Sequence, residues 1–462
     1  MLKNNNSNNN NSNNNNSNNN NSIVEEKQFK ILEEEYESNL LKAFNKEGKC
    51  YLDDKNYLSY RIYGNGKNKL LFIMGLNATG SHWGYQAKYF GNLEDYQVCT
   101  FDNRGIGTSS CPPGPYTTSL LANDALALLN HLEWNDNVNL IGVSMGGMIA
   151  QLMALKQTQR FNSVTFTSTY NSAALVVPTT EDIQIFFKML SRTRTKMMRP
   201  LIKVCFPKPW LKEEILPGLS NFQFLLSTLK KFDFDNSERY SMGEYWQAIA
   251  ALLHNIPPYR LKQIKKSGIK TLVLHGTKDK IIRPTYGTLL SSILSCPLIQ
   301  FKNSGHMLMI ERGIEYNLIL RAHIEGKELN HYLQLENREI DNKNLILVNG
   351  VENKKLEEES NKLCNEHKPE KSWLNKLFHF KKNNDSIELL NNNDHSDFHE
   401  DTDNDNVLDD NNKSPNLKIE KSLSSPIPEN GPFTILNRRS KSFFSANNFN
   451  EFLQNYLSTK QH

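Results

Sequence analysis

The pentapeptide Gly142-Val143-Ser144-Met145-Gly146 stands where a short apolar run changes into a helical pattern. Residues 137–141 (Asn-Val-Asn-Leu-Ile) predict a buried strand, and residues 147–155 predict a helix. A strand that turns directly into a helix is the setting in which the pattern G-x-S-x-G forms a nucleophile elbow. The flanking glycines fit because such a turn leaves no room for side chains. We therefore predict that the Ser144 hydroxyl is exposed at the carboxyl end of the strand.

The same turn predicts a binding site for an oxyanion. The backbone amide of Met145 would lie at the positive end of the helix and would point toward a developing negative charge. A glycine-rich turn that carries a solvent-facing serine is the plainer alternative. The strand before the pentapeptide and the helix after it favour the catalytic interpretation.

A serine hydroxyl becomes a good nucleophile when a base takes its proton, so a histidine held by a carboxylate is expected nearby. For this type of turn the expected chain order is Ser, Asp, His. Asp279 follows a predicted strand at 270–276, and His306 follows another at 298–301. Both side chains would reach the sheet edge where Ser144 lies, which predicts a Ser144–Asp279–His306 triad. A helix cap at Asp279 and an ordinary loop histidine at His306 are the alternatives.

His275 is the competing candidate for the base. It stands at the end of the strand predicted at 270–276 and precedes Asp279 in the chain, which reverses the expected order. We therefore predict that His275 supports the Asp279 loop and does not accept the serine proton.

Strands and helices alternate over most of residues 51–326. The predicted strands, besides those named above, are 57–63, 69–74, 96–101 and 164–167, and the predicted helices include 118–134, 285–295 and 313–325. This alternation indicates an α/β fold in which helices cover both faces of a parallel sheet. Residues 173 to about 262 interrupt the pattern with mostly helical segments, which predicts an insertion between two strands.

The two ends of the chain differ in composition from the middle. Residues 1–22 consist almost entirely of Asn and Ser and are predicted to be a disordered tract. Residues 23–50 are expected to contain an amphipathic helix over 31–44. Residues 327–462 are predicted to be a disordered polar tail. Within this tail, Trp373–Phe380 lies in a basic amphipathic stretch. That stretch would either touch a membrane surface or a partner, or be solvated.

Charge and cysteine content limit the classes of function. The formal net charge is +4, which gives no argument for nucleic acid as a partner. The six scattered cysteines suit a reducing compartment and argue against a zinc site. We find no secretory signal and no run of apolar residues long enough for a membrane span, so the expected location is cytoplasmic. Neither a metal nor a cofactor is expected.

Several motifs together resemble the α/β-hydrolase superfamily, in its group of esterase-like and lactonase-like enzymes. They are Met74-Gly75-Leu76, the stretch Asp102-Asn103-Arg104-Gly105-Ile106-Gly107-Thr108-Ser109, the pentapeptide around Ser144, and the pair Asp279 and His306. The second motif resembles the family's D-x-R-G-x-G-x-S loop and is long enough to be specific. The resemblance covers roughly residues 57–326.

The resemblance implies an eight-stranded, mostly parallel sheet with a helical cap over the site, and residues 173–262 match such a cap. It also implies that the Leu76 amide is an oxyanion donor together with that of Met145. The family usually has His-Gly where this chain has Met74-Gly75, but a backbone donor does not depend on that side chain. The Asp102 loop is implied to be architectural. Dehalogenase-like and epoxide-hydrolase-like relatives use an aspartate nucleophile, which the serine at position 144 excludes.

The resulting hypothesis is a cofactor-free serine hydrolase that cleaves a carboxylic ester, thioester or lactone through an acyl-enzyme. Its small-molecule acyl substrate would lie in an apolar pocket, for which the candidates are Trp83, Phe186, Phe187, Met189 and Met307. Two alternatives stay open: a non-catalytic ligand receptor or scaffold on the same fold, and an acyltransferase.

Overall fold

The structure, a computed structural model, describes residues 45–172, 194–216, 218–233, 240–329, 331 and 345–348. The tract 1–22, the helix expected at 31–44, the segment Trp373–Phe380 and most of the tail lie outside these residues. The expectations for them stay predictions.

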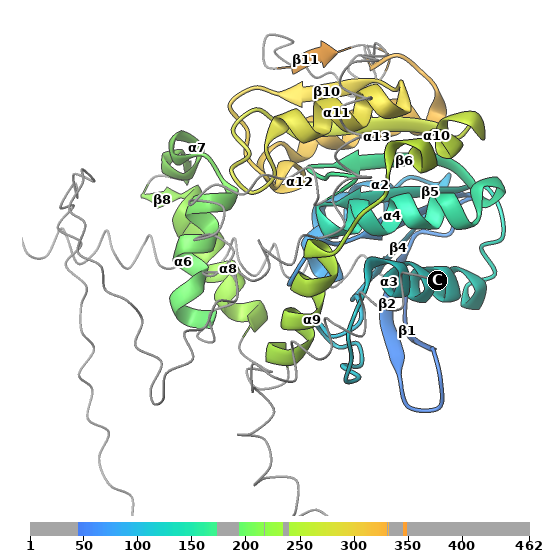
Figure 1. The fold of residues 1–462 in the computed structure, drawn as a ribbon. Helices are drawn as coiled ribbons and strands as arrows, with labels where there is room; N and C mark the ends of the chain where they lie inside the picture. The colour runs from blue at the N-terminus through green and yellow to red at the C-terminus, as the bar shows by residue number, and fades with distance from the viewer. Residues whose placement is uncertain are drawn as a thin grey trace, which may run out of the picture. The chain divides into compact units, whose positions relative to one another are not determined.

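A nine-stranded, mostly parallel sheet runs through the described chain (Figure 1). The strands are β1 (Lys46–Tyr51), β2 (Tyr57–Tyr63), β3 (Asn68–Ile73), β4 (Tyr96–Phe101), β5 (Val138–Val143), β6 (Phe161–Thr167), β9 (Lys270–Gly276), β10 (Leu298–Phe301) and β11 (Leu345–Val348). Their spatial order is β1-β2-β4-β3-β5-β6-β9-β10-β11. In this spatial order, each pair of adjacent strands from β4 through β3, β5, β6 and β9 to β10 is parallel. The pairs β1–β2, β2–β4 and β10–β11 are antiparallel. The predicted fold class is confirmed.

The two edges of the sheet differ from the prediction. The sheet has nine strands where eight were expected, and β11 comes from the region predicted to be a polar tail. Its apolar residues pair antiparallel with β10, from Leu298↔Val348 to Phe301↔Leu345. At the other edge, β1 occupies residues assigned to the N-terminal helical region, and it pairs with β2 through Cys50↔Leu58. The backbone hydrogen bonds that make these segments strands come from β2, the next strand in the chain, for β1 and from the more distant β10 for β11.

Helices cover both faces of the sheet. They are α2 (Gly84–Gly91), α3 (Thr118–His131), α4 (Met145–Lys156), α10 (Pro258–Lys266), α11 (Pro284–Leu294), α12 (Leu308–Glu311) and α13 (Gly313–Glu325). One apolar cluster joins the sheet to α3, α4, α10 and α11, and a second joins it to α2, α12 and α13. In β3, Leu71 and Ile73 belong to the first cluster and Leu70 and Phe72 to the second, as the alternation of side chains along a strand requires.

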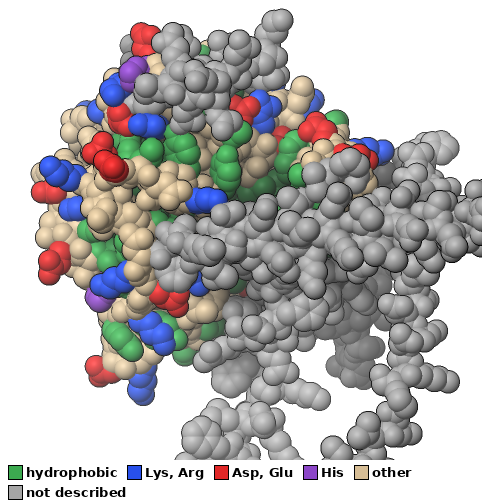
Figure 2. All heavy atoms as spheres, turned by 180° about the vertical axis from the view of Figure 1, so that it is seen from behind, with side chains coloured by type: hydrophobic (Ala, Val, Ile, Leu, Met, Phe, Trp, Pro, Cys, Tyr) green, Lys and Arg blue, Asp and Glu red, His purple; other side chains and the backbone are tan. Residues whose placement is uncertain are grey.

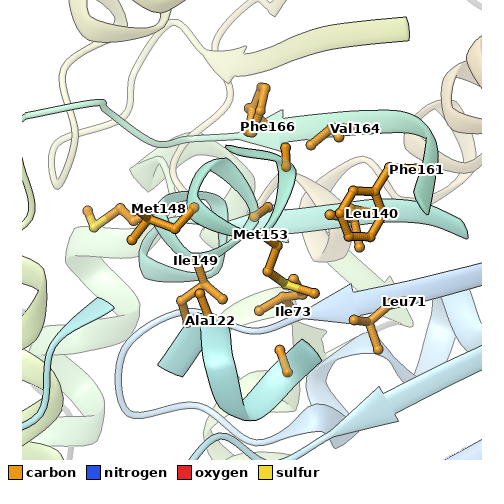
Figure 3. Close-up of a cluster of buried hydrophobic side chains, with 14 of the residues drawn as sticks. Leu71, Ile73, Ala122, Leu140, Met148, Ile149, Met153, Phe161, Val164 and Phe166 are labelled. Carbon is orange, nitrogen blue, oxygen red and sulfur yellow. The ribbon is translucent and has the colours of Figure 1, made fainter. Parts of the chain in front are cut away.

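Helix α4, which follows the predicted nucleophile, is buried on all sides. Its residues 145–154 are all buried, and Figure 3 shows Ile149 and Met153 between the sheet and α3, near Ile73 and Ala122. Burying one such side chain contributes roughly 1.5–3 kcal/mol to stability. The helix that carries the candidate nucleophile at its amino end is therefore rigidly held.

The chain between β6 and β9 carries the predicted insertion. Its described elements are α6 (Arg194–Cys205), α7 (Lys208–Lys212), β7 (Glu214–Leu216), β8 (Leu219–Ser220), α8 (Asn221–Asp233) and α9 (Tyr240–Leu252), followed by α10. A small apolar cluster that includes Ile202, Phe206 and Leu226 packs against Ile281 and Met307. The insertion thus contacts the loops after β9 and β10, the two loops that hold Asp279 and His306.

No helix in the described residues is long and apolar enough to cross a membrane. On the face seen in Figure 2, basic and acidic side chains are interspersed among hydrophobic ones over the described surface. That pattern gives no extended field of one sign on this face.

Candidate active site

Ser144 occupies a sharp turn between β5 and α4. Its backbone angles are φ 55° and ψ −120°, a conformation that costs a non-glycine residue of order 1–3 kcal/mol. The surrounding packing maintains it: a Cβ on Gly142 would lie 2.4 Å from the Gly146 oxygen, and a Cβ on Gly146 would lie 2.1 Å from the Ile73 oxygen. Only glycine fits at these two positions. The turn predicted from the pentapeptide is present.

The end of the neighbouring strand fixes the backbone of Ser144. Its N–H donates to the Thr167 oxygen at 2.9 Å, and its own carbonyl accepts from the Thr169 hydroxyl at 2.8 Å. The Ser144 side chain itself is partly exposed. Ser144 is thus held firmly by its main chain and keeps part of its surface accessible to solvent.

Asp279 and His306 are brought together by adjacent parallel strands, β9 and β10. The His306 Nδ1 donates to Asp279 Oδ2 at 2.8 Å, and both residues are buried. The other carboxylate oxygen, Oδ1, accepts the amides of Ile281 and Ile282, each at 2.9 Å. With its Nδ1 proton directed at the carboxylate, His306 keeps Nε2 as an acceptor.

The Asp279 carboxyl is ionised in this setting. Burial alone would raise its pKa, but the nearby imidazoles of His306 and His275, through charge and hydrogen bonds, outweigh burial and hold the pKa well below its usual range. A permanently charged carboxylate can hold one tautomer of His306 and stabilise its protonated form.

His275 lies behind Asp279 and is completely buried. Its Nε2 donates to the Ile282 oxygen at 2.8 Å and lies 3.3 Å from Asp279 Oδ2. A ring sealed from solvent on this side of the carboxylate has no path to a substrate. This geometry agrees with the supporting role expected for His275.

The His306 loop is held by two residues that sequence reasoning missed. The His306 N–H donates to the carbonyl of Cys205 at the end of α6, at 2.8 Å. The preceding N–H, of Gly305, donates to Glu311 Oε2 at 2.8 Å. A lone carboxylate after the apolar run 307–310 was the available signal for Glu311, whereas a backbone carbonyl such as that of Cys205 leaves none.

The burial of Glu311 predicts that stability depends on pH. Burial raises its pKa from 4.5 to about 7, against the opposing influence of the Gly305 amide, the Ser304 hydroxyl and Arg312, and Glu213 adds to the rise. From about pH 4.5 to 7 the folded state then binds more protons than the unfolded state, so this contribution to stability is present at low pH and lost as pH rises. The whole shift corresponds to roughly 3 kcal/mol.

We therefore compare the wild type with Glu311→Gln, which cannot titrate at this position. The free energy of unfolding of the wild type should fall relative to that of the variant by up to roughly 3 kcal/mol between pH 5 and pH 8. Urea unfolding at several pH values measures it. The variant Glu315→Gln, which removes a carboxylate hydrogen-bonded to Arg312, controls for the altered charge around that arginine. A difference that stayed flat or rose with pH would contradict the prediction.

The two stretches predicted to supply the oxyanion amides both adjoin Ser144. Met145 is the first residue of α4, and Gly75 is close enough that an added Cβ would lie 3.1 Å from the Ser144 Cβ. The Met74–Leu76 stretch therefore passes directly beside the nucleophile turn. The amides of Gly147 and Met148 are already engaged by the Ser144 carbonyl. The oxyanion role of Leu76 and Met145 stays a prediction.

Asp102 organises the glycine-rich loop that follows β4. Its Oδ1 accepts the Gly80 amide and its Oδ2 accepts the Thr108 amide, both at 2.8 Å. Gly107, at φ 58°, packs so tightly that an added Cβ would lie 2.0 Å from Asp102 Oδ2. These bonds agree with the architectural role that the resemblance implies.

Asp102→Asn should lower the free energy of unfolding by about 2 kcal/mol, because an amide group cannot accept both backbone bonds as strongly as a carboxylate. Thermal unfolding of the variant measures the loss. Unchanged stability would show that the loop does not need the carboxylate.

The structure places only two of the five predicted pocket residues, Trp83 and Met307, and in different surroundings. Trp83 is completely buried and packs 4.9 Å from Phe72 and 6.2 Å from Tyr316, measured between ring centroids. The structure thus places Trp83 in the core, and among the described residues no open space beside it supports the pocket role, which stays a prediction. Met307 is partly buried and contacts both the sheet core and the insertion cluster. The remaining candidates, Phe186, Phe187 and Met189, lie outside the described residues.

In the described part of the chain no three His, Cys, Asp or Glu side chains are grouped to hold a metal ion. The cysteines at positions 50, 99, 111, 205 and 296 are unpaired.

A model of the alpha/beta hydrolase fold family matches residues 68–313, more than half of the 462 residues. The chain therefore belongs to this family.

Its similarity to individual proteins is moderate. The chain is 26% identical to 3-oxoadipate enol-lactonase 2 of Acinetobacter baylyi over 267 residues, which are 57% of this chain and 92% of the relative. It is 26% identical to a poly(3-hydroxyalkanoate) depolymerase of Ectopseudomonas oleovorans over 251 residues, 54% and 82% of the two chains. A solved esterase from Exiguobacterium antarcticum superimposes with a TM-score of 0.50 at 20% identity, covering 61% of this chain and all of that one. At this identity the solved structure supports the fold alone.

Proposed function

We propose that this chain is a serine hydrolase that cleaves a carboxylic ester, thioester or lactone of a small molecule without a cofactor. The observation that carries the proposal is the hydrogen-bonded pair His306–Asp279 at the sheet edge where Ser144 occupies its elbow. Similarity to an enol-lactonase and to a polyester depolymerase supports acyl chemistry of this kind.

In the first half-reaction the Nε2 of His306 takes the Ser144 proton while Oγ attacks the substrate carbonyl. The negative charge that develops on the carbonyl oxygen is bound by the amides of Leu76 and Met145. Asp279 stabilises the imidazolium that forms. The tetrahedral intermediate collapses when His306 passes the proton to the departing alcohol, thiol or ring oxygen.

In the second half-reaction a water molecule takes the place of the leaving group. His306 removes a proton from this water, which attacks the acyl-enzyme and releases the carboxylic acid. The proton returns to Ser144 Oγ, so the enzyme regains its starting state. No redox step or metal is needed in this cycle.

The experiment that tests the proposal is labelling with a fluorophosphonate, followed by turnover of p-nitrophenyl esters of increasing acyl length and of simple lactones. We expect one labelled site, Ser144, and hydrolysis of at least one of these substrates. If the intact chain neither labels nor turns over, the receptor or scaffold alternative replaces the proposal. If it labels but passes its acyl group faster to an added alcohol than to water, the acyltransferase alternative replaces it.

A further inference from the structure

Gln247 of α9 joins two loops that lie far from it in the chain. Its side chain is completely buried, its Oε1 accepts the Asn77 N–H at 3.1 Å, and its Nε2 donates to the Arg104 carbonyl at 2.9 Å. One partner is a donor and the other an acceptor, so the amide has one orientation that satisfies both. Both ends of the glutamine amide are thus used, across separations of 170 and 143 residues.

The bond to Asn77 acts on the stretch that carries the first predicted oxyanion donor. The Asn77 N–H belongs to the peptide unit that directly follows Leu76, and Asn77 holds a left-handed conformation at φ 59°. On the other side, the Asn103 side chain donates to the Met74 carbonyl at 3.0 Å. The Gly75–Leu76 peptide, whose N–H would bind the oxyanion, therefore lies between two peptides that are each held by a side-chain amide.

Helix α9 is seated against the same region by a close backbone contact. Gly243 lies one turn before Gln247, and a Cβ on Gly243 would lie 1.9 Å from the Gly105 oxygen. The loop it touches is anchored from the other side, because the Arg104 guanidinium donates twice to the Asp124 carboxylate. A fixed helix and a fixed loop together determine where the Gln247 amide can be.

We propose that Gln247 is a positioning residue, through which helix α9 of the insertion sets the orientation of the oxyanion-binding peptide at Leu76. The inference rests on the proposed hydrolase function and deepens it. The orientation of the Leu76 N–H affects the reaction rate because the negative charge on the substrate carbonyl oxygen develops only as the transition state forms. Loss of a whole oxyanion donor lowers kcat by about 10²–10³-fold. If the Leu76 amide were free to reorient, kcat should therefore fall by a smaller factor.

The test compares Gln247→Met, which keeps the length of the side chain and loses both hydrogen bonds, with Gln247→Glu, which keeps an acceptor for the Asn77 N–H. The readouts are kcat and KM on a short p-nitrophenyl ester and the affinity of a trifluoromethyl ketone, which forms a tetrahedral adduct with the serine. For Gln247→Met we expect kcat to fall about 10–100-fold with KM nearly unchanged, and the ketone affinity to fall by the same factor. Gln247→Glu should recover most of this loss.

Gln151→Met is the matched control. Gln151 lies on α4 and is also a completely buried glutamine, but its Nε2 donates to the Tyr170 carbonyl at 3.0 Å and not to the 74–77 stretch. It should lose stability without a comparable fall in kcat or ketone affinity. Thermal unfolding of all variants separates folding from function.

Two results would overturn the inference alone. One is a wild-type kcat and ketone affinity in folded Gln247→Met, and the other is an equal loss of kcat in Gln151→Met. Both require that the wild type labels at Ser144 and hydrolyses ester, so the proposed function stands in either case. A wild type that neither labels nor turns over would overturn the proposed function and this inference together.

Discussion

Ser144→Ala is expected to abolish fluorophosphonate labelling and to lower kcat by on the order of 10⁶, as loss of the nucleophile does in comparable triads. The fold should survive the change, because alanine keeps a Cβ and the elbow is held by the main-chain bonds to Thr167 and Thr169. Mass spectrometry of the labelled protein and ester turnover measure the two effects. The residual rate would come from substrate binding and the oxyanion amides.

Ser168→Ala is the matched control for this variant. Ser168 follows the neighbouring strand β6, is also a serine at positive φ (45°), and is completely buried. Its removal should leave labelling intact. Labelling that persisted in Ser144→Ala, or that disappeared in Ser168→Ala, would reassign the nucleophile.

Asp279→Asn is expected to lower kcat by roughly 10⁴, by analogy with the same change in serine proteases. The asparagine oxygen would be drawn to the amides of Ile281 and Ile282, which now bond to the carboxylate. Its NH₂ would then face His306 Nδ1 and favour the tautomer with the proton on Nε2. That tautomer cannot accept the serine proton.

The pH dependence of stability gives a second readout for the same variant. The pKa of Asp279 is depressed in the folded state, so its contribution to stability is present at neutral pH and lost as pH falls below the usual range for aspartate. Asp279→Asn should therefore lose stability relative to wild type at pH 7 and less so in acid. Urea unfolding at pH 3 and pH 7 measures the difference.

Asp102→Asn makes the same substitution at another buried aspartate that follows a strand of the sheet. It should lower the melting temperature and leave the kcat of the folded fraction within a few-fold. If folded Asp102→Asn were inactive while Asp279→Asn turned over normally, the carboxylate role would belong to Asp102.

Local pattern was enough to predict the centre of the fold. The strands predicted at 57–63, 96–101, 270–276 and 298–301 have the same bounds as β2, β4, β9 and β10. β9 is a nearly continuous buried apolar run, as expected of a strand inside a parallel sheet, whereas the antiparallel β2 alternates between buried and partly exposed residues. Either pattern can be recognised within about seven neighbouring residues. The alternation of the strands with helices then places the carboxyl ends of β5, β9 and β10 at one edge. This explains why the sequence could predict Ser144, Asp279 and His306 at one sheet edge; the structure shows the Asp279–His306 bond, and the triad stays a proposal.

The sequence by itself therefore determined the α/β fold class, the elbow at Ser144 and the order of the three candidate catalytic residues, because those depend on short-range periodicity and on the turn chemistry of glycine. Only the tertiary structure decided that β1 and β11 extend the sheet, that Trp83 belongs to the core, and that Glu311 and Gln247 brace the loops beside the site. These features depend on how the whole chain packs. Gln247 and β11 meet partners that are far away in the sequence, whereas β1 and Glu311 have nearby partners whose pairing follows from the surrounding fold. The apolar run 307–310 marks Glu311 in the sequence, but its bond to the Gly305 amide becomes evident only in the fold, and Gln247 meets Asn77 across 170 residues, which no local pattern could show.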